Sequence, residues 1–179
     1  MSSPLQRFEF RFKAYTSRSI RLLLSDSQGV AATILICCAI DLAAKYFSGD
    51  ASFQNNKSKY VAFIDKYFPS HYDATSFYSF VRCGLLHGFS MENEYLILCS
   101  NEKWALNAHL QVDPKSGCTV INPFILHRDL SRAFLAYVSD IRSDNELHER
   151  FQRVHSKLPL KQQQRSWRKL KGLSQNNSA

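Results

Sequence analysis

Residues 30–47 have the sequence VAATILICCAIDLAAKYF, which is apolar at almost every position. Asp41 and Lys45 are the only charged residues in this stretch, and Ser48 and Gly49 follow it in the position of a helix C-cap. A helix that is apolar nearly all round must be covered by other elements on every side. The stretch therefore predicts the central helix of a helical bundle.

Other segments have the spacing of apolar residues that is typical of helices packed around such a core. Each also has a capping or helix-ending residue at a boundary. We expect helices over residues 4–25 (Ser3 and Gln6 at capping-box spacing), 60–68 (ended by Pro69), 73–88 (capped by Asp73, ended by Gly88), 122–141 (Asn122 as N-cap before Pro123) and 143–154 (capping box from Ser143 to Glu146).

The pattern changes in the region of residues 94–122. Residues 94–99 and 108–112 are short apolar runs typical of strands, and residues 113–117 have the composition of a turn. We therefore predict a small β-hairpin inserted into the bundle around residues 94–122.

Length and composition suit one globular domain, because 45% of the 179 residues are hydrophobic and 13% are aromatic. The expected fold class is mainly α. We expect residues 1–157 to form a single helical-bundle domain with the hairpin insertion, and residues 158–179 to form a basic, loosely ordered C-terminal tail.

The sequence also predicts a cytoplasmic protein with no membrane association. The longest apolar run, residues 30–40, is interrupted only by Thr33 and is shorter than the about 20 residues that a membrane span needs. The N-terminus lacks the apolar core of a secretory signal. Five cysteines without CxxC spacing indicate neither a disulfide framework nor a zinc site, so we expect them to be mostly buried apolar residues.

The net charge of +8 comes entirely from the C-terminal end. Residues 1–149 contain 15 basic and 15 acidic residues, whereas residues 150–179 contain eight basic residues and no acidic one. Such an extension can attract phosphate backbones, and a tryptophan within it could stack on a base. The alternative is a solvated tail that only aids solubility. The candidate nucleic-acid-binding residues are Arg150, Arg153, Lys157, Lys161, Arg165, Trp167, Arg168, Lys169 and Lys171.

Several familiar catalytic motifs are absent from the sequence, which contains no GxxxxGK[ST], GxGxxG, HExxH or GxSxG pattern. His148 and His155 could share a helix face, but no third metal ligand is evident. We therefore expect no metal and no cofactor.

Arg82 and His87 stand out within the segment FYSFVRCGLLHG, residues 77–88, because they lie on or just beyond an otherwise apolar helix. A buried guanidinium needs a partner, and Asp41 is the lone acid of the apolar helix, so we predict a contact between Arg82 and Asp41. Five residues on a regular α-helix place two side chains about 140° apart, so convergence with Arg82 requires His87 to lie at the helix end. A helix C-terminus favours an imidazolium, which suits a general acid or base.

The sequence RCGLLH from Arg82 to His87 resembles the R-x(4–6)-H motif of the HEPN superfamily, and residues 28–90 also resemble small, largely uncharacterised bacterial proteins of this type. The resemblance implies a helical bundle and a metal-independent endoribonuclease, many active members being toxins or antiviral effectors. It further implies a homodimer, RNA as substrate, and an antitoxin or other protein partner. His87 would transfer a proton and Arg82 would stabilise the transition state. Cys83 departs from the family pattern, which often has a polar residue at this position.

Other interpretations of this segment remain open. Arg82 and His87 could be a structural ion-pair partner and a helix cap in a non-catalytic interaction module that binds a protein. Tyr78 could supply a hydroxyl or could be a packing residue. Cys83 beside Arg82 could act as a nucleophile, although no His/Asn pattern accompanies it. We keep Asp41, Tyr78 and Cys83 as supporting site residues.

Overall fold

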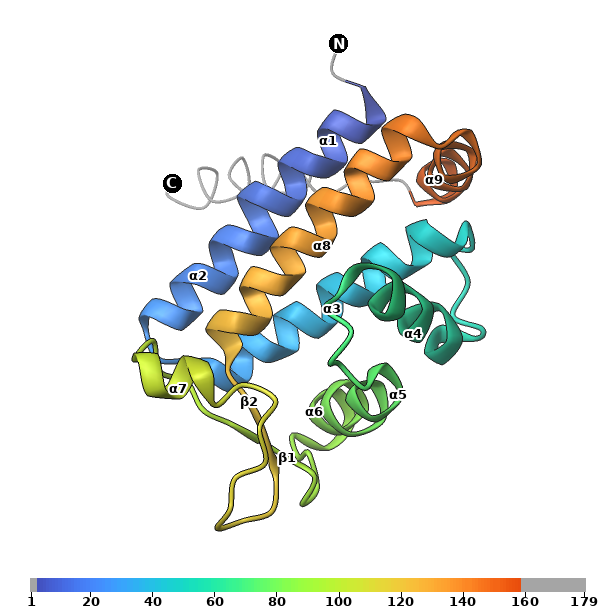
Figure 1. The fold of residues 1–179 in the computed structure, drawn as a ribbon. Coiled ribbons are helices and arrows are strands. Elements are labelled where there is room, and N and C mark those ends of the chain that lie inside the picture. Colours follow the sequence, from blue (N-terminus) through green and yellow to red (C-terminus); the bar gives the residue numbers. More distant parts are fainter. Residues whose placement is uncertain (1–2, 159–179) are drawn as a thin grey trace, which may run out of the picture.

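The structure is a computed structural model that describes residues 3–158. It confirms the mainly α fold (Figure 1). Along the chain the elements are α1 (Pro4–Arg11), a π-helical segment η1 (Phe12–Ser17), α2 (Arg18–Ser25), α3 (Gly29–Ser48), α4 (Asn56–Tyr67), α5 (Ala74–Ser76), a second π-helical segment η2 (Phe77–Cys83), α6 (Gly84–Gly88), β1 (Tyr95–Ile97), α7 (Lys103–Asn107), β2 (Thr119–Ile121), α8 (Pro123–Ser143) and α9 (Asn145–Lys157).

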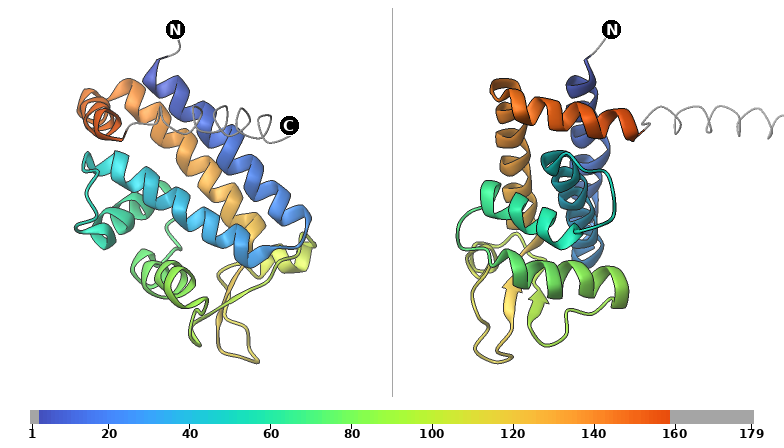
Figure 2. Two further views of the ribbon diagram at one scale, coloured as in Figure 1. Left: turned by 180° about the vertical axis from the view of Figure 1, so that it is seen from behind. Right: turned by 90° about the vertical axis from the view of Figure 1, so that its right-hand side faces the viewer.

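Helix α3 lies in the middle of the bundle, as the sequence predicts. It packs against α2, α4, α8 and α9, while the continuous helix from α1 to α2 runs beside α8 in the opposite direction (Figures 1 and 2). Ile36, Ile40 and Tyr46 of α3 are completely buried. Burial of several large apolar side chains in one helix, each contributing about 1.5–3 kcal/mol, explains why the other helices assemble around it.

Helix α3 is, by length and composition, also the one helix among the described residues that could cross a membrane. The expectation that no segment is long enough for a span is therefore wrong, because the apolar stretch continues past Asp41 to Ser48. Such a helix is weak evidence for membrane insertion, since the core helix of a soluble bundle meets the same criterion.

Helix ends follow local sequence signals closely. Ser3 and Gln6 form the predicted capping box, with Gln6 N donating to Ser3 Oγ at 3.1 Å. The predicted C-cap Gly49 has φ +73°. The start of α9 differs from expectation: Asp144, rather than Ser143, caps this helix by accepting from Glu146 N at 2.8 Å, because α8 continues through Ser143.

The predicted β-hairpin is wrong. Strand β1 pairs with β2 in parallel, in the register Tyr95–Thr119 to Ile97–Ile121, and residues 108–112 contribute only an isolated bridge at Val112. Parallel strands need a crossover connection, and the segment that includes α7 supplies it. The residues from Thr119 to Ile121 are all β-branched, which favours a strand. They closely follow the turn-like residues 113–117, which made this strand hard to recognise from sequence.

The cysteines also differ from expectation. All five are free, but only Cys37 is buried, whereas Cys38 is exposed and the others are half-buried. Burial raises the pKa of the Cys37 thiol to about 12, so this thiol is protonated and unreactive at neutral pH.

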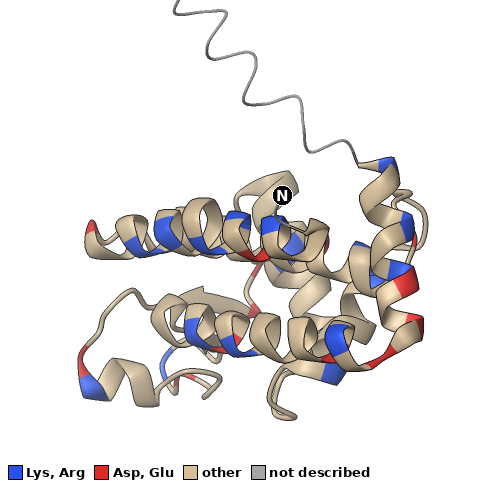
Figure 3. Ribbon diagram, turned by 90° about the horizontal axis from the view of Figure 1, so that it is seen from above, with Lys and Arg blue, Asp and Glu red and all other residues tan. Residues whose placement is uncertain are grey.

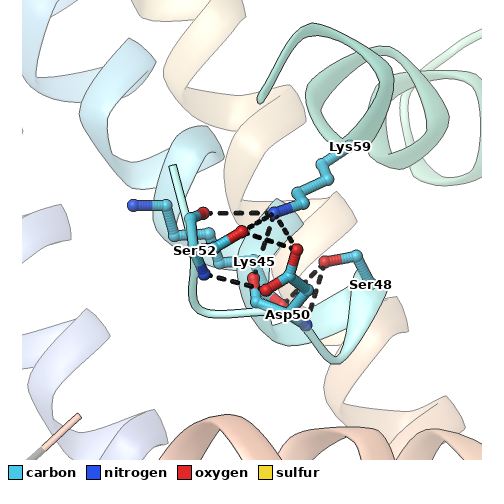
Figure 4. A network of polar contacts seen from close by, with 5 residues as sticks. All are labelled: Lys45, Ser48, Asp50, Ser52 and Lys59. Carbon is cyan, nitrogen blue, oxygen red and sulfur yellow. Dashed lines mark hydrogen bonds and ion pairs between the residues drawn. The ribbon is translucent and has the colours of Figure 1, made fainter. Parts of the chain in front are cut away.

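The loop that leaves α3 is fixed to α4 by Lys59, which is only 8% exposed (Figure 4). Its ammonium lies 2.6 Å from Asp50 Oδ2 and donates to the carbonyl of Ser52 at 3.1 Å. The hydrogen bond from Lys59, followed by those from Ser52, lowers the pKa of Asp50. These contacts join the C-terminal end of α3 to α4.

A buried polar network joins β2 and α8 to residue Tyr72. The backbone N–H of Asn122 donates to His109 Nδ1 at 3.0 Å, so the proton of the neutral imidazole must lie on Nε2. His109 Nε2 is 2.8 Å from the Tyr72 hydroxyl, which in turn donates to Asp129 Oδ2 at 3.0 Å. Protonating His109 would therefore break its bond to the Asn122 N–H inside the core.

We expect the stability of the fold to fall between about pH 6.5 and pH 4 because of His109. Burial lowers the pKa of His109 in the folded protein to about 4, whereas a histidine in the unfolded chain has a pKa of about 6.5. Between these two pH values the unfolded chain binds a proton that the folded protein does not bind, so unfolding is favoured as the pH falls. The neutral His109 contributes about 3 kcal/mol at most to the free energy of unfolding. This contribution is fully present above about pH 6.5 and is lost toward about pH 4. Urea unfolding at pH 7 and pH 4.5 measures it, with His109→Gln as the non-titrating comparison; equal pH dependence in both proteins would contradict the assignment.

Candidate functional site

Arg82 and His87 lie on one continuous helix that consists of α5, η2 and α6 (Figure 1). Asp73 starts this helix by accepting from Ser76 N at 2.9 Å. Arg82 lies in η2, where the π-helical pattern interrupts regular α-helix, and His87 lies in the last turn of α6. Single π-helical turns within α-helices occur often at functional sites, which makes this segment a candidate site on geometry as well as on sequence.

The predicted contact between Arg82 and Asp41 is present. Arg82 Nε and Nη2 donate to Asp41 Oδ2 at 3.0 and 2.9 Å. Both side chains are mostly covered, with 14% of Arg82 and 18% of Asp41 exposed. Burial by itself would lower the pKa of Arg82, but hydrogen bonding and the charge of Asp41 outweigh burial and raise it. The guanidinium is therefore a fixed positive charge, anchored to the central helix.

The third nitrogen of the guanidinium faces His87. Arg82 Nη1 lies 3.4 Å from His87 Nε2, and the His87 side chain is exposed at the end of α6. Asp41 thus contacts the guanidinium at Nε and Nη2, whereas the His87 imidazole contacts it at Nη1. The Arg82 and His87 side chains converge at the helix end, as their spacing of five residues requires.

Tyr78 and Cys83 surround the same guanidinium. The Tyr78 ring centre is 5.4 Å from the guanidinium carbon, and Cys83 Sγ is 3.8 Å from Nη1. Burial, followed by the nearby Cys83, raises the pKa of Tyr78. Its ring also packs edge-on against Tyr60 at 5.2 Å, so Tyr78 mainly helps to hold Arg82 in place.

Two lysines that the sequence analysis did not single out lie near this site. Lys57 Nζ donates to Ser79 Oγ at 3.4 Å, one helical turn before Arg82. Lys45 is one turn beyond Asp41 on α3, and its ammonium lies 3.8 Å from the Phe53 ring centre. Neither lysine forms an ion pair with a carboxylate within residues 3–158. Two further positive charges therefore lie on the helices that hold Arg82 and its neighbours.

Gly84 fixes the chain just beyond the helix. Ser90 N donates to the Gly84 carbonyl at 3.2 Å, and a Cβ on Gly84 would lie only 2.1 Å from the Ser90 carbonyl oxygen. Phe89, rather than the expected Gly88, is the left-handed residue that ends α6, with φ +52°. The close approach at Gly84 thus sets where the segment after His87 runs.

We expect Gly84→Ala to lower the free energy of unfolding by about 1–3 kcal/mol, because the added methyl group would displace backbone atoms. Gly88→Ala is the matched control, since a Cβ there meets nothing within 4 Å. Urea unfolding of both variants measures the difference. Equal stability of the two variants would show that the segment from Phe89 to Ser90 moves freely.

The three candidate basic residues within residues 3–158 are separate from this site. Arg150 pairs with Glu146 and packs its stem against Gly49, whereas Arg153 and Lys157 are exposed. Helix α9, which carries all three, lies at the other end of the fold from α6, with α4 between them (Figures 1 and 2). Lys161, Arg165, Trp167, Arg168, Lys169 and Lys171 lie outside the described residues.

Histidines 148 and 155 each contact a neighbouring side chain of α9. His148 contacts Gln152, and His155 stacks on Phe151 with ring centres 5.6 Å apart. Within residues 3–158, no group of three or more His, Cys, Asp or Glu side chains is arranged to hold a metal ion.

Comparisons with protein-family models, with curated proteins and with solved structures found no match. Any function must therefore be inferred from the chain's own side chains.

Proposed function

We propose that the protein is a metal-independent endoribonuclease of HEPN type, with Arg82 and His87 as its catalytic residues. The observation that carries this proposal is the 3.4 Å approach of Arg82 Nη1 to an exposed His87 Nε2, while Asp41 holds the rest of the guanidinium. A proton-transfer group and a fixed positive charge are thereby paired at the surface, which is the combination that phosphodiester transesterification requires.

In the proposed reaction, the RNA 2′-oxygen attacks the adjacent phosphorus while His87 takes the 2′-hydroxyl proton. The bond from phosphorus to the 5′-oxygen breaks, and solvent supplies the proton to the departing oxygen. Arg82 stabilises the negative charge on the phosphoryl oxygens in the transition state. The products are a 2′,3′-cyclic phosphate and a 5′-hydroxyl. Asp41 is a positioning residue, because it acts only through Arg82.

The biological setting is part of the proposal. We propose a cytoplasmic homodimer that acts in bacterial stress or phage defence, with an antitoxin or other protein partner. The basic residues from Arg150 to Lys171 would hold the RNA backbone, as the excess of positive charge at that end suggests.

A non-catalytic interaction module is the second candidate, and one observation favours it. The ion pair between Arg82 and Asp41 is mostly covered and joins η2 to α3, as a purely structural pair would. The exposed position of His87 against the guanidinium is not needed for that role, and for this reason we prefer the nuclease.

The test is cleavage of an end-labelled structured RNA by the purified protein in EDTA, followed by analysis of the new ends. We expect cleavage that leaves a 2′,3′-cyclic phosphate, and no cleavage where the mapped site carries a 2′-deoxy substitution. A protein that leaves the RNA intact, or that cleaves the 2′-deoxy substrate equally well, would rule out the proposed reaction.

A further inference from the structure

A recess lies where the end of α2, the segment before α7 and the start of α8 meet. Figure 1 shows these elements together beside the start of α3. The volume of the recess is about 650 Å³, within the range of about 300–1,000 Å³ for small-molecule sites. None of its lining residues is acidic. They are Arg21, Leu24, Ser25, Ser27, Cys99, Ser100, Asn101, Phe124 and His127.

Arg21 brings a positive charge to the lining of this recess. It is exposed and forms no ion pair within residues 3–158. Other Lys and Arg residues are spread along the whole helix from α1 to α2 (Figure 3). The Arg21 guanidinium can therefore form two parallel hydrogen bonds to a phosphate group.

Polar donors near Arg21 are also unused. The Ser27 and Asn101 side chains make no hydrogen bond among the described residues, and Ser100 Oγ only accepts one, from Glu102 N at 3.2 Å. Ser25 differs, because its hydroxyl already donates to the Leu22 carbonyl. Three side chains that can still donate thus lie around one free guanidinium.

The start of α3 adds to the positive potential. This 20-residue helix has no side-chain cap and no acidic residue in its first turn. It begins at Gly29, whose Cα lies so close to Cys99 that an added Cβ would be 2.6 Å from the Cys99 Cβ. Since Ser27 and Cys99 both line the recess, the positive end of the α3 dipole adjoins it.

Apolar side chains form the other part of the lining. Leu24 is buried, and the half-buried Phe124 brings an aromatic ring to the lining. His127 is held by the contact of its Nε2 with Ser17 Oγ at 2.9 Å. Burial, followed by the charge of Arg21, lowers the pKa of His127, so its ring is neutral at pH 7. The lining therefore combines a positively charged, hydrogen-bonding part with an aromatic and apolar part.

We propose that this recess binds a nucleoside monophosphate, with the phosphate on Arg21, Ser100 and Asn101 and the base against Phe124. The proposal does not depend on the nuclease. Gly29 and Asp41 are twelve residues apart on α3, so this recess is about 18 Å along the helix from the Arg82 site. The same chemistry could come from a free mononucleotide or from the 5′-phosphorylated end of an RNA.

The test measures binding to the full chain by calorimetry, with AMP, adenosine and inorganic phosphate as separate probes. We expect AMP to bind more tightly than either fragment. Arg21→Gln should weaken AMP binding by about 10- to 100-fold, because a hydrogen bond to a charged group is lost. Arg18→Gln is the matched control, since Arg18 is also exposed on α2 but does not line the recess.

A second variant separates the two parts of the recess. Phe124→Leu should weaken AMP while leaving phosphate binding unchanged, because only the base contacts the ring. Competition of AMP by a 5′-phosphorylated oligoribonucleotide, but not by its 5′-hydroxyl form, would identify an RNA end as the source of the ligand. Absence of AMP binding, or equal AMP affinity in Arg21→Gln and Arg18→Gln, would overturn the proposal.

Discussion

Replacing His87 with alanine should reduce metal-free RNA cleavage by about 10²- to 10⁴-fold, the usual contribution of a general acid or base. The His87 side chain is exposed, so its loss leaves the core untouched and the free energy of unfolding nearly unchanged. The measurement pairs a cleavage rate in EDTA with urea unfolding of the same preparation. A large loss of rate without a loss of stability is the signature of a catalytic side chain.

His148→Ala is the control for this experiment. His148 is also an exposed helical histidine, but it lies on α9, far from Arg82. We expect His148→Ala to cleave RNA at the wild-type rate. Equal rates for the wild type, His87→Ala and His148→Ala would assign the cleavage to a contaminating ribonuclease and leave His87 as a helix-end residue.

Loss of the Asp41 carboxylate should destabilise the fold. Asp41→Ala should lower the free energy of unfolding by about 2 kcal/mol, because it leaves the mostly covered Arg82 guanidinium without its carboxylate. This value is below the 3–5 kcal/mol typical of a fully buried pair, since both side chains retain some contact with water. Urea unfolding measures it, and the cleavage rate should fall as well because Arg82 loses its anchor.

The double variant Asp41→Leu with Arg82→Met separates the two roles of the pair. Replacing both charges by apolar groups of similar size removes the unpaired charge, so most of the stability should return. Cleavage should not return, because the guanidinium is gone. If the double variant were as unstable as Asp41→Ala, packing around the pair rather than its charge would account for the loss.

Local signals in the sequence predicted most of the helices. The capping box at Ser3 and the N-cap at Asn122 act through neighbouring backbone groups, so they could be recognised without knowledge of the fold. The contact between Arg82 and Asp41 was also predictable, because each is a rare charge within an apolar helix and has few alternative partners.

The remaining features depend on residues far apart in the chain. The parallel pairing of β1 with β2 depends on a crossover that no local pattern specifies. The network of Tyr72, His109 and Asp129 joins three separate segments, each of which contributes one polar side chain that no local motif marks. The recess around Arg21 likewise combines residues of three segments, so its existence follows only from the packing of the bundle.

Arg82 and His87 are proposed to work as one chemical unit. Single-turnover cleavage rates in EDTA for the wild type, Arg82→Ala, His87→Ala and the double variant test it most directly. Residues of one catalytic unit are strongly non-additive, so the double variant should be about as slow as the slower single variant, and both single variants should be far slower than the wild type. Effects that multiply, or four equal rates, would contradict the claim.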